Sequence, residues 1–194
     1  MQSNNIIRKL YFLTVLLIFL PVFLTAEDKR IIPLDMYLII DDSSSMQASK
    51  NDAIGWINEQ VIDRILADGD KITIWTAGDK AEINYSDTIS GDAGKKTVKD
   101  KLLAMGSEGK TADFTGALID AASRISQTPR DRLSYTMLIT ASAEGLEPVL
   151  TGNSPGNLKW FRSEKFQRWQ VLVVAPDIGG KVQQAAAAYM RTLR

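Results

Sequence analysis

The sequence predicts one doubly wound α/β domain, with a mostly parallel central sheet, one antiparallel edge strand and helices on both faces. Three observations lead to this prediction. Short, nearly continuous apolar runs, which are typical of strands buried on both faces, alternate with segments of helical periodicity. One alternating segment follows the second run after a short turn, so we expect it to return as a hairpin. Polar residues stand directly after the first apolar run, where ligands bind in such sheets.

Each element follows from its residue pattern. The predicted strands cover residues 31–40, 71–77, 81–85, 134–140 and 170–175. Segment 81–85 follows a glycine-containing turn and is expected at the edge of the sheet. Apolar residues at helical spacing predict helices over residues 47–66, 93–105, 114–125, 158–166 and 182–193.

The composition is that of a globular protein. The chain has 194 residues, of which 45% are apolar and 24% are charged, and this length suits one domain with a real core. Lys and Arg together number 23, as do Asp and Glu, so bulk charge gives no case for nucleic acid and we expect none as a partner.

Two residue types are missing from the sequence, and their absence excludes whole classes of chemistry. There is no cysteine, which excludes disulfides, zinc–thiolate sites and a thiol nucleophile. There is no histidine, which excludes Ser-His-Asp triads and the commonest general base. We therefore expect a protein that is not an enzyme.

The first residues have the pattern of a targeting segment. Arg8 and Lys9 precede an apolar run over residues 10–24, and Ala26 is followed at once by charged residues. This pattern is typical of a secretory signal peptide cleaved after Ala26.

The prediction divides the chain into a signal peptide, 1–26, and a domain, 27–194. The alternative is that residues 10–24 stay uncleaved and anchor the chain, which would be its only membrane contact; the run is short for a span of about 20 residues. In both cases the protein is exported, to the periplasm or the medium.

The stretch after the first strand alternates oxygen-bearing side chains at Asp41, Ser43 and Ser45. Side chains at alternate positions of a turn can point the same way, and hard divalent cations such as Mg²⁺ prefer oxygen ligands. An alternative stays open from these residues alone, in which Ser43 or Ser45 is the N-cap of the following helix.

Four segments, in order along the chain, resemble the von Willebrand factor type A (vWA) family, and an exported bacterial member of it in particular. The similar segments are MYLIIDDSSSM at 36–46, DKITIWTAGDKAEINYS at 70–86, GKTADFTGALIDA at 109–121 and YTMLITASAEG at 135–145. The resemblance covers most of the domain and implies the vWA fold.

The resemblance also implies a metal-ion-dependent adhesion site. In it Ser43 and Ser45 would ligate the ion directly, Asp41 directly or through water, and Thr111 would be the threonine ligand. The implied ion is Mg²⁺, with Mn²⁺ or Ca²⁺ as alternatives.

The sequence departs from the family pattern after its fourth predicted strand. The family usually has an aspartate there, and this chain has Ala141, which offers no oxygen. The site is therefore partly degenerate, with Ser142 and Glu144 as possible auxiliary donors.

The implied function is that of an exported protein-binding module, whose partner completes the metal site with an acidic residue. One alternative is a metal-independent vWA scaffold in an envelope complex. Another is a hydrolase that uses Ser43, Ser44 or Ser45 with Lys50. Because Lys50 lies in an amphipathic helix, we expect it to be a solvated lysine instead.

Overall fold

The computed structural model describes residues 30–106, 109–129, 131–141 and 169–174. The predicted signal peptide and the predicted helices at 158–166 and 182–193 lie outside these residues. So do the possible auxiliary donors Ser142 and Glu144.

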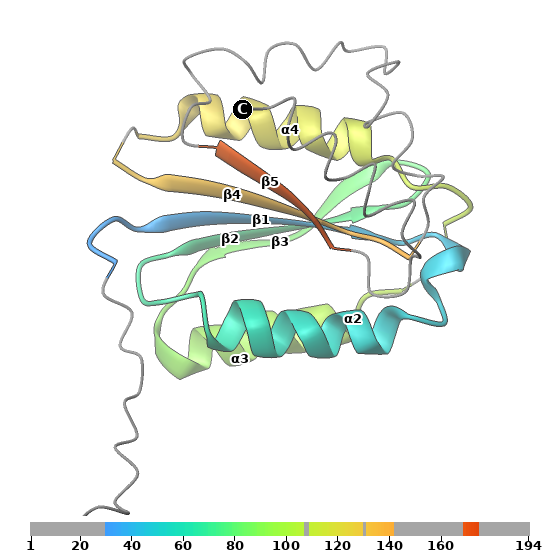
Figure 1. The fold of residues 1–194 in the computed structure, drawn as a ribbon, viewed down its shortest axis with the longest axis horizontal. Helices are drawn as coiled ribbons and strands as arrows, with labels where there is room; N and C mark the ends of the chain where they lie inside the picture. Colours follow the sequence, from blue (N-terminus) through green and yellow to red (C-terminus); the bar gives the residue numbers. More distant parts are fainter. Residues whose placement is uncertain (1–29, 107–108, 130, 142–168, 175–194) are drawn as a thin grey trace, which may run out of the picture.

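The sheet has five strands in the order β3-β2-β1-β4-β5 (Figure 1). Neighbouring strands are parallel except for the β2–β3 hairpin, which is antiparallel and puts β3 at the edge. The strands are β1 (Leu34–Asp41), β2 (Lys71–Ala77), β3 (Ala81–Thr88), β4 (Leu133–Ile139) and β5 (Trp169–Val174). This arrangement confirms the predicted sheet, including the antiparallel edge strand.

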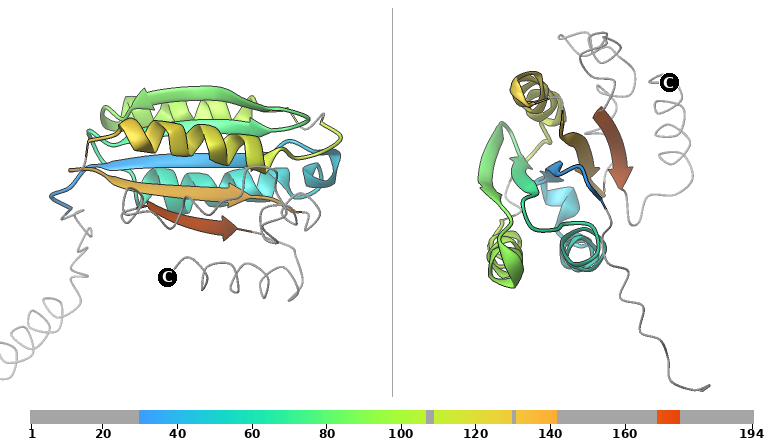
Figure 2. Two further views of the ribbon diagram at one scale, coloured as in Figure 1. Left: turned by 90° about the horizontal axis from the view of Figure 1, so that it is seen from above. Right: turned by 90° about the vertical axis from the view of Figure 1, so that its left-hand side faces the viewer.

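Helices cover both faces of the sheet, as predicted (Figure 2). Helix α4 (Phe114–Gln127) lies on one face, while α2 (Lys50–Trp56) and α3 (Gly91–Leu103) lie on the other. None of the helices in the described part is long and apolar enough to cross a bilayer.

The helix predicted over residues 47–66 is not a single α-helix. A short 3₁₀ turn, η1 (Ser44–Met46), precedes α2, and α2 continues into a π-helix, η2 (Ile57–Asp63). The buried residues Val61 and Leu66 are five positions apart, which in an α-helix would turn them roughly 140° from each other. The amide of Leu66 bonds to the carbonyl of Val61 at 3.0 Å, and this wider turn keeps both side chains on the core.

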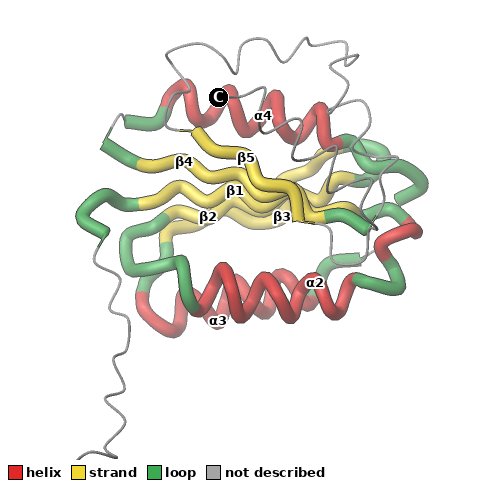
Figure 3. Tube along the Cα trace, in the orientation of Figure 1, coloured by secondary structure: helices red, strands yellow, loops and turns green. Residues whose placement is uncertain are grey.

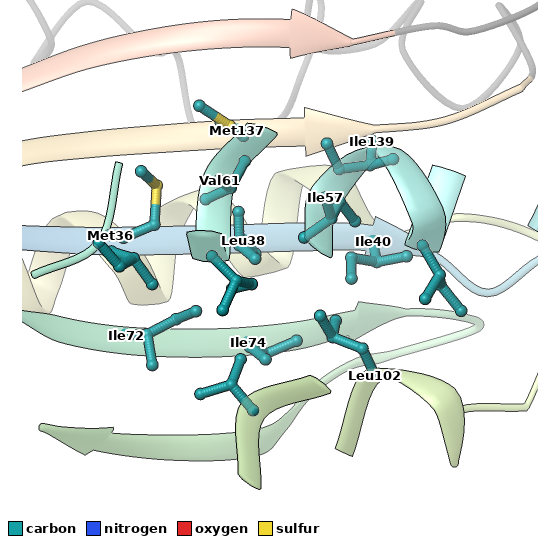
Figure 4. Close-up of a cluster of buried hydrophobic side chains, with 14 of the residues drawn as sticks. Met36, Leu38, Ile40, Ile57, Val61, Ile72, Ile74, Leu102, Met137 and Ile139 are labelled. Atoms are coloured by element: carbon teal, nitrogen blue, oxygen red, sulfur yellow. The ribbon is translucent and has the colours of Figure 1, made fainter. Parts of the chain in front are cut away.

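Strand β1 is buried along its whole length and forms the centre of the core. On the face covered by α2 and α3, its side chains pack with those of neighbouring elements (Figure 4). Figure 4 shows Met36, Leu38 and Ile40 of β1 among Ile57, Val61, Ile72, Ile74 and Leu102. A fully buried, doubly covered strand is a rigid support, so the residues at its carboxyl end have a fixed position.

Candidate functional site

Three segments meet at the carboxyl ends of β1 and β2 (Figure 3): the residues after β1, the β2–β3 turn, and the loop before α4. Ser43 forms a parallel bridge with Gly109 of that loop. The amide of Ser44 donates to the carbonyl of Gly109 at 2.9 Å, and the amide of Gly109 donates to the carbonyl of Asp42 at 2.9 Å. The loop that contains Thr111 is thus joined directly to the Asp41–Ser45 stretch.

Gly109 is the residue that permits this close approach. A Cβ atom at this position would lie 3.1 Å from the Cα of Gly78 and 3.2 Å from the carbonyl oxygen of Asp42. Both atoms belong to the backbone and cannot rotate away, so only glycine fits between the two segments without a shift.

Asp41 lies at the inner end of the site, with an exposed fraction of 2%. Its Oδ1 accepts from the amide of Ser43 at 2.8 Å, and its Oδ2 accepts from the hydroxyl of Thr140 at 2.5 Å. One donor on each oxygen fixes the orientation of the carboxylate and leaves further lone pairs on both oxygens.

The hydroxyls of Ser43 and Ser45 face each other, with their Oγ atoms 2.8 Å apart. Ser43 is buried and Ser45 is exposed, so the pair leads from the interior to the surface. The N-cap alternative receives no support from the geometry. Ser43 stands at the N-cap position of η1 without a side-chain cap hydrogen bond, and Ser49, not Ser45, stands at that of α2.

Thr111 makes a contact that the sequence did not predict, with Asp79 of the β2–β3 turn. The hydroxyl and the amide of Thr111 each donate to Oδ1 of Asp79 at 3.1 Å, and the amide of Lys110 donates to the same oxygen at 3.1 Å. These bonds, that of the Thr111 amide first, lower the pKa of the exposed Asp79 carboxyl below its ordinary value. An aspartate in a glycine-containing turn is common for local reasons, so its sequence position gave no sign of this role.

Ala141, where the family pattern has an aspartate, is half-buried and packs against the core. The structure therefore leaves a methyl group at the fourth strand end. Within the described ranges, no three acidic, histidine or cysteine side chains come together in a group that could hold a metal ion.

The donor set that remains consists of oxygen atoms only: the Asp41 carboxylate and the Ser43, Ser45 and Thr111 hydroxyls. Oxygen donors of this kind fit a hard cation such as Mg²⁺ or Mn²⁺, which keeps several waters when few side chains bind it. Asp41 is the one charged member of this set, so the residues fit a weakly held ion better than a tightly held one.

Lys50 occupies a different position from the solvated one that its sequence suggested. Its ammonium group donates to the backbone carbonyls of Met105 and Gly106. These contacts connect the start of α2 with the segment after α3. Two of the three donors of this ammonium group are thus used on backbone carbonyls.

The mostly parallel sheet with one antiparallel edge strand and helices on both faces has a vWA-like fold. The fold is similar to that of the von Willebrand factor type A structure from Catenulispora acidiphila, with a TM-score of 0.50 and 14% identity over 84% of this chain and 42% of that one. No family model matches the sequence.

Two further structures have the same fold and are described with a metal. The manganese-loaded TRAP protein of Plasmodium vivax has a TM-score of 0.56 and 17% identity, over 83% of this chain and 62% of that chain. Proximal thread matrix protein 1 from the mussel byssus, with a zinc-occupied MIDAS motif, has a TM-score of 0.52 and 14% identity, over 74% of this chain and 38% of that chain. Our chain thus spans less than two thirds of each of the three structures. At identities this low, the structural likeness shows the fold alone.

One curated relative is similar in sequence. It is an uncharacterized protein of Treponema pallidum (strain Nichols), 20% identical over 175 residues, which cover 85% of this chain and 78% of that protein.

Proposed function

We propose that the protein is an exported vWA module that binds another protein through a Mg²⁺-dependent site formed by Asp41, Ser43, Ser45 and Thr111. The observation that carries this proposal is the pair of facing Ser43 and Ser45 hydroxyls, 2.8 Å apart, next to the fixed carboxylate of Asp41. Export rests on the predicted signal peptide.

The low charge of the donor set suggests what the partner contributes. Hydroxyls are neutral ligands, so the chain supplies one carboxylate charge from Asp41 against the two charges of the ion. A bound divalent ion would supply an uncompensated positive charge and an open coordination position, both suited to a carboxylate. We therefore propose that an acidic side chain of the partner completes the site.

The division of roles among the residues follows from their exposure. Asp41 is buried, so its proposed part is to hold the inner side of the site, directly or through a water molecule. Ser45 and Thr111 are exposed, so we propose that a partner reaches the ion from their side. The manganese and zinc found in two vWA-fold structures support a divalent ion, although those observations concern those proteins.

A metal-independent scaffold is the second candidate function, and one observation favours it. Ala141 removes the second acid of the site and packs against the core instead. In this alternative the domain contacts its envelope partner through another surface, and the hydrogen bonds around Asp41 serve only to join strand ends. We propose a non-enzymatic role in both cases, supported by the position of Lys50.

A pull-down separates the two functions. The full chain, immobilised and incubated with envelope extract, should retain a partner in Mg²⁺ and release it in EDTA. The Ser43→Ala/Ser45→Ala variant should fail to retain it, whereas Ser44→Ala, a matched change between the two positions, should behave as the parent. Retention of the same partner in EDTA, by parent and double variant alike, would favour the scaffold.

A further inference from the structure

We propose that Asp79 is an outer carboxylate of the candidate metal centre, which orients Thr111 and supplies the negative charge that Ala141 lacks. This inference rests on the proposed Mg²⁺ site and assigns a positioning residue to it. Its basis is the set of contacts between the β2–β3 turn and the loop before α4.

The direction of the hydrogen bond leaves Thr111 able to ligate. Its hydroxyl is the donor to Asp79 Oδ1, because an ionised carboxylate can only accept. The hydroxyl proton therefore points to Asp79 in the β2–β3 turn, and the lone pairs of the hydroxyl oxygen remain for an ion. A carboxylate that accepts from a ligating group fixes its orientation and increases its basicity, as outer-shell partners do in metal sites.

Two backbone bonds make the arrangement stiff. The amides of Lys110 and Thr111 converge on the same oxygen of Asp79, at 3.1 Å each. Further along the loop, the amide of Asp113 donates to the carbonyl of Gly78 at 2.9 Å. The turn thus holds the loop at two places, so the position of Thr111 is set by Asp79 and not by the loop alone.

The charge of Asp79 lies next to a proposed ligand, across β1 from the position of the missing acid, because β2 and β4 flank β1 on opposite sides. The loop has the β2–β3 turn on one side and the serine stretch on the other, since Gly109 pairs with Ser43 while Thr111 bonds to Asp79. The carboxylate of Asp79 therefore contacts a proposed ligand, Thr111, directly. Ala141, at the end of β4, is the position from which the family pattern supplies its acid.

The test measures Mn²⁺ affinity of the full chain in detergent, from the electron paramagnetic resonance signal of free Mn²⁺. Asp79→Asn keeps the size of the side chain and an accepting oxygen but removes the charge. We expect it to weaken Mn²⁺ binding by about tenfold, the usual lower range for an outer-shell partner. Glu82→Gln is the matched control, because it removes one exposed charge from the same hairpin, and it should change the affinity by no more than about twofold.

A second variant separates charge from loop anchoring. If Asp79 replaces the missing acid, then Ala141→Asp in the Asp79→Asn background should restore the affinity of the parent. Weak binding that Ala141→Asp does not restore would reduce Asp79 to a loop anchor and overturn the charge role. Thermal unfolding in EDTA checks that each variant is folded.

The remaining outcomes distinguish this inference from the proposed function. Parent binding that Asp79→Asn leaves unchanged would overturn the role of Asp79 while the metal site stands. A folded parent that binds no Mn²⁺ at millimolar concentration would overturn the metal site and this inference together.

Discussion

The hydroxyl of Thr140 donates to Oδ2 of Asp41 at 2.5 Å, which joins the ends of β4 and β1 across 99 positions of sequence. Both residues are buried, with exposed fractions of 0% and 2%. Because Oδ1 of the same carboxylate accepts from the Ser43 amide, the orientation of Asp41 depends on a strand and on the serine turn at once. Thr140 directly precedes Ala141. The end of β4 therefore contributes to the site by orienting Asp41, although Ala141 itself offers no oxygen.

Removal of the Thr140 hydroxyl should therefore destabilise the domain. Thr140→Val keeps the shape but leaves one oxygen of a buried carboxylate without its donor, and we expect a loss of about 1.5–3 kcal/mol. Thr140→Ser keeps the hydroxyl and should cost only about 1 kcal/mol for the lost methyl group. Urea unfolding measures both, and a valine variant as stable as the serine variant would contradict the account.

Two glycine-to-alanine substitutions should change the stability of the domain in opposite directions. Gly109→Ala places a methyl group against two backbone segments, so we expect it to destabilise the domain by about 1–3 kcal/mol. Gly55→Ala lies within α2 with nothing within 4 Å of the new Cβ, and it should stabilise the domain by about 0.5–1 kcal/mol. Both variants add the same methyl group, so chemical unfolding compares the two positions directly. Equal unfolding midpoints of the two variants would show that the loop before α4 is not tightly held.

An ion pair at the opposite end of the sheet, between the buried Asp35 and the half-buried Arg132, should contribute strongly to stability. Nε of Arg132 donates to Oδ1 of Asp35 at 2.6 Å, and Asp35 is only 3% exposed. Arg132→Met leaves that charge without its cation and should cost about 3–5 kcal/mol. Lys96→Met, which breaks an exposed i,i+4 pair on α3, should cost less than about 0.5 kcal/mol.

The double variant Asp35→Leu/Arg132→Met tests the cause of that loss. If the cost comes from the unpaired buried charge, removal of both partners should recover much of the stability in chemical unfolding. A double variant that is as unstable as Arg132→Met would instead point to the bonds from Arg132 to the carbonyls of Leu34 and Gly69.

The serine cluster should not act as a nucleophile. The ammonium group of Lys50 is held by the carbonyls of Met105 and Gly106, so we expect no labelling of the full chain by a fluorophosphonate. Mass spectrometry of the treated protein provides the measurement. Labelling at Ser45 that disappears in Lys50→Met would revive the Ser-Lys hydrolase.

The sheet could be predicted from sequence because its signals are local. Strands such as β1 are buried on both faces and therefore appear as continuous apolar runs, and the edge strand β3 follows a short turn. The π-helix η2 could not be predicted in this way. Its wider turn changes the spacing of the apolar residues only slightly, to five positions between Val61 and Leu66, and such a step is hard to distinguish from ordinary helical spacing.

The candidate site was predictable only in part, for a similar reason. Asp41, Ser43 and Ser45 are close in sequence, and their alternation predicts that they lie together. The bonds from Thr111 to Asp79 and from Thr140 to Asp41 join residues 32 and 99 positions apart. Such pairings depend on how loops meet at the end of the sheet, which no local pattern specifies.

The most direct test of the account is the melting temperature of the full chain in Mg²⁺ and in EDTA. Only the folded state assembles the ligands, so at about 10 mM Mg²⁺ a dissociation constant of about 1 mM would add about 1.4 kcal/mol of stability. For a domain of this size the rise should be about 3–6 °C. We expect this rise in the parent and in Ser44→Ala, and its loss in Ser43→Ala/Ser45→Ala. Equal melting temperatures of the parent in Mg²⁺ and EDTA, or an undiminished rise in the double variant, would contradict the proposed metal site.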